Sequence, residues 1–86
     1  MSSDQWCVYI VKCNDGTFYT GCTNDLNKRI ATHNLGKGAK YTRSRLPIIL
    51  VYTEIQNNVS DSLKRENVIK KLTRQQKLKL ISDHPS

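Results

Sequence analysis

The sequence contains no long apolar run, and no window approaches the roughly 18 apolar residues that a membrane span needs. A basic flank followed by an apolar segment, the form of a secretory signal, is also missing from its start. We therefore expect neither insertion nor secretion, and a cytoplasmic protein. Repeats, low-complexity tracts and flexible linkers are absent as well, so we expect residues 1–86 to form a single domain.

Cysteine and acidic residues are scarce. The three cysteines are an odd number, and their spacing differs from the C-x-x-C pairs of structural zinc sites, so we expect reduced thiols in or near the core. Only 7 acidic residues face 14 lysines and arginines, for a net charge of +7. This balance predicts a polyanionic partner and leaves too few carboxylates for a two-metal site. The last helical segment lacks the bulky apolar face that membrane binding needs, which favours nucleic acid.

Residue patterns predict three strands and three helices. The segments rich in aromatic and β-branched residues, which sheets favour, are Trp6–Cys13, Phe18–Cys22 and Ile48–Ile55. Caps and stop signals predict helices over Asp25–Leu35, from Ser60 or Asp61 to Leu72, and over 73–82 after the capping box Thr73-x-x-Gln76. Residues 36–47 are expected to be a basic loop. The order is β-β-α-β-α-α, with a core over about 6–72 and a C-terminal helix over about 73–82.

The turn between the first two strands decides which side chains share a face. A two-residue turn at 15–16 would place Tyr9 and Tyr19 on opposite faces of the sheet. A three-residue turn at 14–16, with Gly16 left-handed, would place Tyr9, Tyr19 and Gly21 on the same face. The order Asn-Asp-Gly favours the three-residue turn, because glycine tolerates the positive φ of its last position.

Three charged or polar residues accompany the two tyrosines. Arg29 and His33 are one turn apart on the predicted first helix, where a guanidinium and an imidazole can meet a phosphate. Glu66 lies at the edge of the apolar arc of the second helix, where it can hold a divalent cation. Each residue also has an ordinary structural explanation: tyrosines suit strands, a helical arginine is usually solvated, and Glu66 can pair with Lys70 at i+4.

In chain order these residues follow the pattern Y-x9-Y-x-G-x7-R-x3-H, with a helical glutamate further on. This ordered set resembles the GIY-YIG nuclease superfamily, and in particular its small stand-alone members and the nuclease domain of branched-DNA structure-specific endonucleases. The two family motifs correspond to Cys7-Val8-Tyr9 and Tyr19-Thr20-Gly21. The resemblance covers about Trp6 to Leu72 and implies an α+β fold, a small three-stranded antiparallel sheet flanked by helices.

The resemblance implies a metal-dependent endonuclease that hydrolyses DNA phosphodiester bonds, with branched or damaged DNA in repair or recombination as its expected substrate. Tyr9 would activate the attacking water, and Tyr19 would position phosphate or water. Arg29 would stabilise the phosphoryl oxygens, while His33 would relay the tyrosine's proton or bind phosphate. Glu66 would hold a single Mg²⁺ or Mn²⁺.

Basic residues outside this set are expected to contact the DNA backbone without reading its sequence. The strongest candidates are Lys37, Lys40, Arg43, Arg45 and Lys70, joined by Lys64, Lys71, Lys77 and Lys79. Tyr41 lies within the basic loop, where its ring either stacks on an unpaired base or packs on its own domain. We expect a monomer, with a protein partner as one candidate source of specificity.

Two alternatives stay open. The residues at 7, 8 and 20 replace the family's glycine and isoleucines at strand positions, and no asparagine follows Asn67, where many members carry one. The strand substitutions are at expected packing positions and leave the catalytic residues in place, whereas the missing asparagine favours a nucleic-acid-binding module with the same fold and weak or no catalysis. A third possibility is an interaction protein whose basic surface binds an acidic protein partner.

Overall fold

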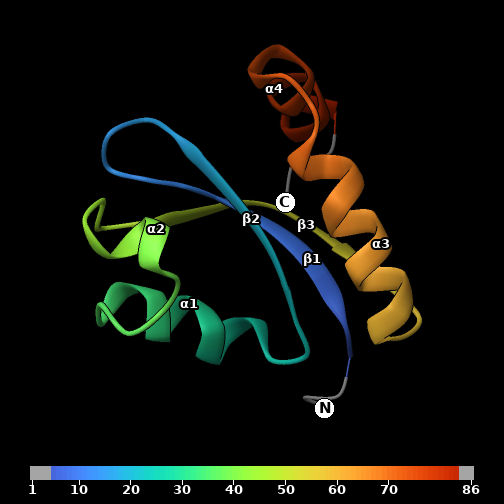
Figure 1. Cartoon of the computed structure of the whole chain (residues 1–86), viewed down its shortest axis with the longest axis horizontal. Helices are drawn as coiled ribbons and strands as arrows, with labels where there is room; N and C mark the ends of the chain where they lie inside the picture. The colour runs from blue at the N-terminus through green and yellow to red at the C-terminus, as the bar shows by residue number, and fades with distance from the viewer. Residues whose placement is uncertain (1–4, 84–86) are drawn as a thin grey trace.

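A central antiparallel sheet in the order β2-β1-β3 organises the molecule, which a computed structural model describes over residues 5–83 (Figure 1). The strands are β1 (Cys7–Lys12), β2 (Phe18–Thr23) and β3 (Ile49–Ile55), and the helices are α1 (Leu26–Asn34), α2 (Lys40–Arg43), α3 (Val59–Lys70) and α4 (Arg74–Asp83). Helices α1 and α2 lie on one side of the sheet and α3 on the other (Figure 1). The α+β class and the predicted order are confirmed, with α2 as an additional short helix.

The hairpin between β1 and β2 has the predicted three-residue turn. Gly16 has φ 85° and its N–H donates to the carbonyl of Cys13 over 2.9 Å, while the N–H of Cys13 donates to the carbonyl of Thr17 over 2.8 Å. Tyr9 therefore pairs with Gly21 across the two strands, and Tyr19 pairs with Val11. Because side chains alternate along a strand, Tyr9, Tyr19 and Gly21 share one face, as the three-residue turn predicts.

Both faces of β1 are buried, which fits a central strand between two layers of helices. On one face Val8 and Ile10 pack with Tyr52 and with Ile69 of α3. On the other face Tyr9 and Val11 form a second cluster, and the α1 side chains that pack against it are Leu26 and Ile30. The helix α4 also joins the first cluster, through Leu80 and Ile81. All three cysteines are free thiols, two of them buried, as expected.

Part of the segment 36–47 is helical, so the sequence interpretation, a loop throughout, was wrong here. Residues 40–43 form α2, and the side chain of Asn34 ties the end of the segment to α1. Its Oδ1 accepts from the N–H of Ile48 over 2.9 Å, and its Nδ2 donates to the carbonyl of Ile48 over 3.3 Å. A helix of four residues shows no periodicity in the sequence, so α2 gave no signal.

Helix caps explain the observed boundaries. Asp25 caps α1, accepting from the N–H of Lys28, and Gly36 follows the helix with φ 78°. The prediction for α3 was wrong: Asn58, not Ser60 or Asp61, is the cap, since its Oδ1 accepts from the N–H of Asp61 over 2.8 Å. The helix α3 also ends earlier, at Lys70 rather than Leu72. The capping box that opens α4 is confirmed, because Thr73 and Gln76 exchange hydrogen bonds of 2.9 and 3.2 Å.

Candidate active site

Tyr9 is the most enclosed member of the predicted site. Its side chain is on central strand β1, only 1% exposed, and lies against the backbone of Gly21 on β2. A Cβ atom at Gly21 would stand 2.5 Å from the hydroxyl oxygen of Tyr9 and 2.7 Å from its ring. Glycine is thus required at position 21 to leave room for the phenol, which gives a steric reason for a glycine in the second motif.

Two side chains of α1 converge on the hydroxyl of Tyr9. The Nε2 of His33 lies 3.0 Å from the Tyr9 oxygen, and the Nε of Arg29 donates to that oxygen over 3.3 Å. Tyr19 packs against the same imidazole, its ring 5.6 Å from that of His33 at an angle of 64°. The structure therefore brings four of the five predicted residues into one cluster. Their catalytic roles stay predictions.

Thr42 of α2 is a member of this cluster that the sequence interpretation missed. Its Oγ1 lies 2.9 Å from Nδ1 of His33 and donates to the carbonyl of Ala39 over 2.9 Å. Both Thr42 and His33 are completely buried. Thr42 lies nine residues after His33, within the polar segment that follows the first helix. A single threonine in such a segment carries no chemical signal of its own.

Burial and charge set the protonation states of the cluster. Burial raises the pKa of Tyr9, and the hydrogen bond and charge of Arg29 act in the opposite direction. The pKa of His33 is lowered, first by burial and then by the Arg29 charge. The bond to Tyr9 raises the pKa of the Arg29 guanidinium. At neutral pH the cluster therefore holds a phenol, an uncharged imidazole and a guanidinium cation.

Glu66 contacts the edge strand β2 from the side of the sheet opposite to Tyr9. One of its oxygens, Oε1, accepts from the thiol of Cys22 over 3.3 Å, and Cys22 follows Gly21 on β2. The other oxygen, Oε2, forms an ion pair with Lys70 over 2.8 Å, the i+4 pair considered from sequence. Burial, together with the neighbouring carboxylate, raises the pKa of Cys22 to about 11. Within residues 5–83 no hydrogen bond joins Glu66 to the Tyr9 cluster, so β2 separates the two halves of the predicted site.

The donors around Glu66 suit a hydrated ion rather than a protein-enclosed one. No group of three histidine, cysteine or acidic side chains able to hold a metal is present among residues 5–83. Mg²⁺ is commonly held by one or two carboxylates, with water and substrate phosphate as its other ligands. The side chain of Glu66 is 13% exposed, and its carboxylate could be one such ligand, in competition with Lys70.

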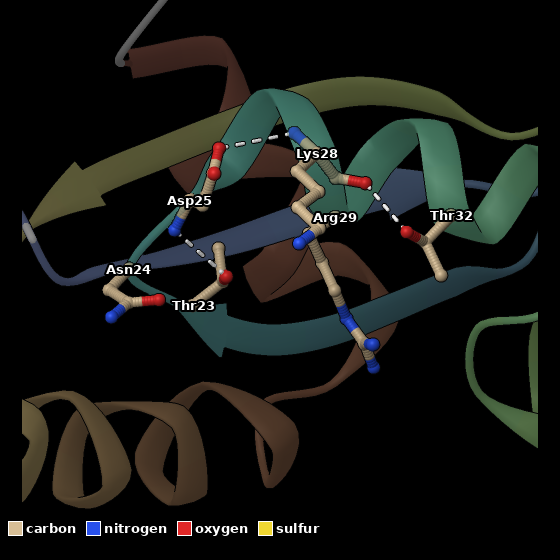
Figure 2. A pocket seen from close by; sticks show the side chains of 6 residues that line it. All are labelled: Thr23, Asn24, Asp25, Lys28, Arg29 and Thr32. Atoms are coloured by element: carbon tan, nitrogen blue, oxygen red, sulfur yellow. Dashed lines mark hydrogen bonds between the residues drawn. The ribbon is translucent and has the colours of Figure 1, made fainter. Parts of the chain in front are cut away.

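Arg29 lies between the two halves. Figure 2 shows its side chain leaving α1 and extending across strand β2, beside an open pocket of about 270 Å³. The pocket also includes Lys28, a second cation that the sequence interpretation did not select. Tyr19 and Cys22 are close enough to Arg29 for their charged forms to raise its pKa. The exposed side of Arg29 is therefore placed to meet an anion at the edge of β2.

The predicted nucleic-acid contacts divide into two groups. Tyr41 stacks on Tyr19, with ring centres 6.0 Å apart, and the guanidinium of Arg45 lies 3.9 Å from the Tyr41 ring centre. Arg45 also pairs with Asp15 over 3.0 Å, so it ties α2 to the hairpin. The remaining cations predicted to contact DNA lie on the surface: Lys77 is partly exposed, and the exposed ones are Lys37, Lys40, Arg43, Lys64, Lys70, Lys71 and Lys79.

A second open pocket, of about 240 Å³, lies between these aromatic rings and the helices α3 and α4. Tyr19 and Tyr41 line it together with Lys70 and Lys77. Tyr41 thus packs on its own domain while 38% of it stays exposed. Two lysines and two aromatic rings at one opening form a surface that suits a nucleic-acid strand.

A family model described as the GIY-YIG catalytic domain matches residues 5–79. The chain belongs to the GIY-YIG family. This confirms the family prediction, and the family's two motifs are the paired segments of β1 and β2 that place Tyr9 beside Gly21. The chain is therefore assigned to a family of nucleases.

Several GIY-YIG relatives have nearly the same length. A UPF0213 protein of Staphylococcus epidermidis is 58% identical over 80 residues, which covers 93% of this chain and 98% of that protein. A UPF0213 protein of Staphylococcus aureus is 54% identical over the same coverage. Their names state no activity.

Two solved structures share the fold. The solution structure of the UPF0213 protein BH0048 from Bacillus halodurans has a TM-score of 0.58 and 44% identity, covering 91% of this chain and 83% of that one. The solution structure of EF2693 from E. faecalis has a TM-score of 0.65 and 38% identity, covering 96% and 90%. No helix within residues 5–83 is long and apolar enough to cross a membrane.

Proposed function

We propose that the protein is a metal-dependent endonuclease that hydrolyses DNA phosphodiester bonds, with branched or damaged DNA as the substrate class. The observation that carries this proposal is the buried hydroxyl of Tyr9, held between the Nε of Arg29 and the Nε2 of His33. Hydrolysis needs an activated water, a cation for the developing phosphoryl charge and help for the leaving oxygen. A basic chain of the GIY-YIG family offers residues for each task.

Tyr9 would activate the water together with His33. The pKa values of a phenol and an imidazole lie roughly 3.5 units apart in water, at about 1.36 kcal/mol a unit, so full proton transfer costs about 5 kcal/mol before the surroundings act. Burial widens that gap, because it raises the pKa of Tyr9 and lowers that of His33. The Arg29 cation lowers both pKa values, so it favours the phenolate and also disfavours the imidazolium. This balance favours a concerted step, in which Tyr9 gives its proton to His33 as it takes one from the water.

Arg29 would stabilise the charge on the phosphoryl group. Its Nε bonds to Tyr9, and its two terminal nitrogens remain for the oxygens of a phosphate. Tyr19, in contact with His33, would help to position the phosphate or the water. Lys28, Lys70 and Lys77 line the two flanking pockets, where they would hold the neighbouring phosphates of the strand.

Glu66 would hold a single Mg²⁺ or Mn²⁺, and Lys70 would release it to do so. When bound, such an ion polarises the phosphodiester and stabilises the leaving alkoxide. The thiol of Cys22 orients the carboxylate beside β2. Cys22, with its pKa raised to about 11, stays protonated at neutral pH, and its thiol donates a weak hydrogen bond to the carboxylate that would hold the ion.

A specific observation favours one alternative, a nucleic-acid-binding module without appreciable turnover. Both oxygens of Glu66 are already engaged by protein groups, Cys22 and Lys70. No asparagine after Asn67 adds a further polar ligand near the end of the domain. In this case the basic surface would bind DNA, and loss of the Glu66 carboxylate would change no measurable activity.

A cleavage assay separates these functions. Purified protein is incubated with labelled duplex, single-stranded and branched DNA in Mg²⁺ or Mn²⁺, beside the variants Tyr9→Phe and Glu66→Gln and an EDTA control. Matched variants are Tyr52→Phe on β3, whose hydroxyl bonds to Glu54, and Glu54→Gln, whose carboxylate pairs with Arg65. Neither belongs to the Tyr9 cluster.

The endonuclease proposal expects cleavage that Tyr9→Phe, Glu66→Gln and EDTA each remove, and that both matched variants retain. Absence of cleavage together with salt-dependent DNA binding would support the binding module. Absence of salt-dependent binding would contradict both functions and favour an acidic protein as the partner.

A further inference from the structure

The hydrogen bonds around His33 have directions that can be worked out by counting protons. Thr42 has one hydroxyl proton, and its Oγ1 lies 2.9 Å from the carbonyl oxygen of Ala39. A carbonyl oxygen only accepts, so Thr42 gives its proton to Ala39. Toward Nδ1 of His33, also 2.9 Å away, Thr42 therefore presents a lone pair. Nδ1 must carry the proton of this bond.

The assignment at Nδ1 fixes the other ring nitrogen. A neutral imidazole has one N–H, so Nε2 of His33 is an acceptor, and the bond of 3.0 Å to Tyr9 is donated by the phenol. The Nε of Arg29, which only donates, supplies a bond to the same phenol oxygen. The hydrogen bonds thus form a series that runs in one direction, with each donor giving one proton. The series passes from Arg29 through Tyr9, His33 and Thr42 to the carbonyl of Ala39.

The opposite tautomer would interrupt this series of hydrogen bonds. Nε2–H of His33 and Nε–H of Arg29 would then both point at the oxygen of Tyr9, leaving the phenol proton without a partner in a side chain that is only 1% exposed. Thr42 would then donate to Nδ1 and give up its own bond to Ala39, whose carbonyl still accepts from the N–H groups of Thr42 and Arg43. The buried phenol proton is then the group left unsatisfied, at a cost of roughly 1 to 3 kcal/mol, so the reversed arrangement is disfavoured.

The backbone of the 36–47 segment closes around the same nitrogen. A Cβ atom at Gly38 would stand 2.3 Å from Nδ1 of His33, so this backbone lies directly against the imidazole. His33 and Thr42 are both completely buried. Thr42 is therefore the group that decides what Nδ1 bonds to.

We propose that Thr42 is a positioning residue, which holds neutral His33 in the Nδ1–H tautomer so that Nε2 can accept the proton of Tyr9. The kinetic consequence rests on the proposed nuclease function, whereas the tautomer is a property of the free protein. In the reaction, the Tyr9 proton moves to Nε2 and the phenol oxygen takes a proton from water. The hydroxide oxygen bonds to phosphorus as the ester P–O bond breaks. Solvent protonates the leaving alkoxide, and the Nε2 proton of buried His33 later returns to Tyr9 as Tyr9 releases its own proton to solvent.

Nitrogen-15 NMR of the imidazole tests the tautomer directly. In the full chain at pH 7.5, we expect His33 to show a protonated Nδ1 and an unprotonated Nε2, with its signals assigned by their loss in His33→Asn. Thr42→Val, which keeps the side-chain shape and removes the hydroxyl, should shift the proton toward Nε2. Thr42→Ser, which keeps the hydroxyl, should restore the wild-type spectrum.

Kinetics provide the second measurement. Because general-base help contributes about 10² to 10⁴-fold, we expect Thr42→Val to lower kcat by about 10 to 100-fold with little change in KM, and Thr42→Ser to recover most of it. A spectrum of the wild-type protein with Nε2 protonated would overturn the proposal. This measurement does not depend on whether any variant folds. So would a folded Thr42→Val protein with unchanged tautomer and kcat. A protein that cuts no DNA but shows the Nδ1–H tautomer would overturn the nuclease function while leaving this assignment of Thr42 intact.

Discussion

Adding a single methyl group at Gly21 should disable the site, because it would enter the space that Tyr9 occupies. In Gly21→Ala the new Cβ would lie 2.5 Å from the Tyr9 oxygen, against ordinary contacts of 3.4 Å or more, so the phenol must move by about 1 Å. Tyr9 is only 1% exposed, so its neighbours would have to shift with it. Overpacking of this kind costs about 1 to 3 kcal/mol.

The displacement also carries a kinetic cost. A shift of about 1 Å in a reacting group can reduce a rate by about 100-fold. It would lengthen the bonds from Tyr9 to His33 and Arg29, which at 3.0 and 3.3 Å are already at normal or long distances. We therefore expect Gly21→Ala to lose both stability and nearly all cleavage.

Gly16→Ala is the matched control, since the same methyl group there meets nothing within 4 Å. Gly16→Ala should lose stability only because a residue other than glycine is strained at φ 85°, a left-handed conformation that costs roughly 1 to 2 kcal/mol. Urea unfolding should show similar losses for both variants, and initial cleavage rates should fall only for Gly21→Ala. Equal rates in the two variants, or a wild-type rate in Gly21→Ala, would refute the steric argument.

Two further predictions concern stability. The pKa of His33 is lowered in the native state, by burial and then by Arg29, so the unfolded chain binds its proton first as the pH falls. We expect the contribution of His33 to the free energy of unfolding to be complete above about pH 6.5 and to be lost as the pH falls from there toward the lower native pKa. This decrease should be absent in His33→Asn. A free energy of unfolding in urea that stays constant from pH 7.5 to 5 would contradict a lowered pKa of His33. Asn34→Ala removes both bonds to Ile48 and should cost about 1 to 3 kcal/mol in urea unfolding, whereas Asn27→Ala, exposed on the same helix, should stay within about 0.5 kcal/mol. Equal losses in the two asparagine variants would show that the Ile48 bonds do not stabilise the segment.

The features that the sequence determined by itself are local. The order Asn-Asp-Gly defined the three-residue turn, because only its last position needs a positive φ, and that turn placed Tyr9, Tyr19 and Gly21 on one face. Helical spacing brought Arg29 and His33 to the same side of α1, where both meet Tyr9. Each of these inferences depends on neighbouring residues and on a fixed backbone period.

Only the tertiary structure decided how distant segments meet. Thr42 is nine positions from His33, in a four-residue helix without periodicity, and its contact with the imidazole depends on how the 36–47 segment folds back onto α1. Glu66 and Cys22 are 44 positions apart, and the packing of α3 on β2 brings them together. The sequence could name Glu66 but could not place it on the opposite side of β2 from Tyr9. Such contacts arise from the packing of whole elements, which no local pattern of residues encodes.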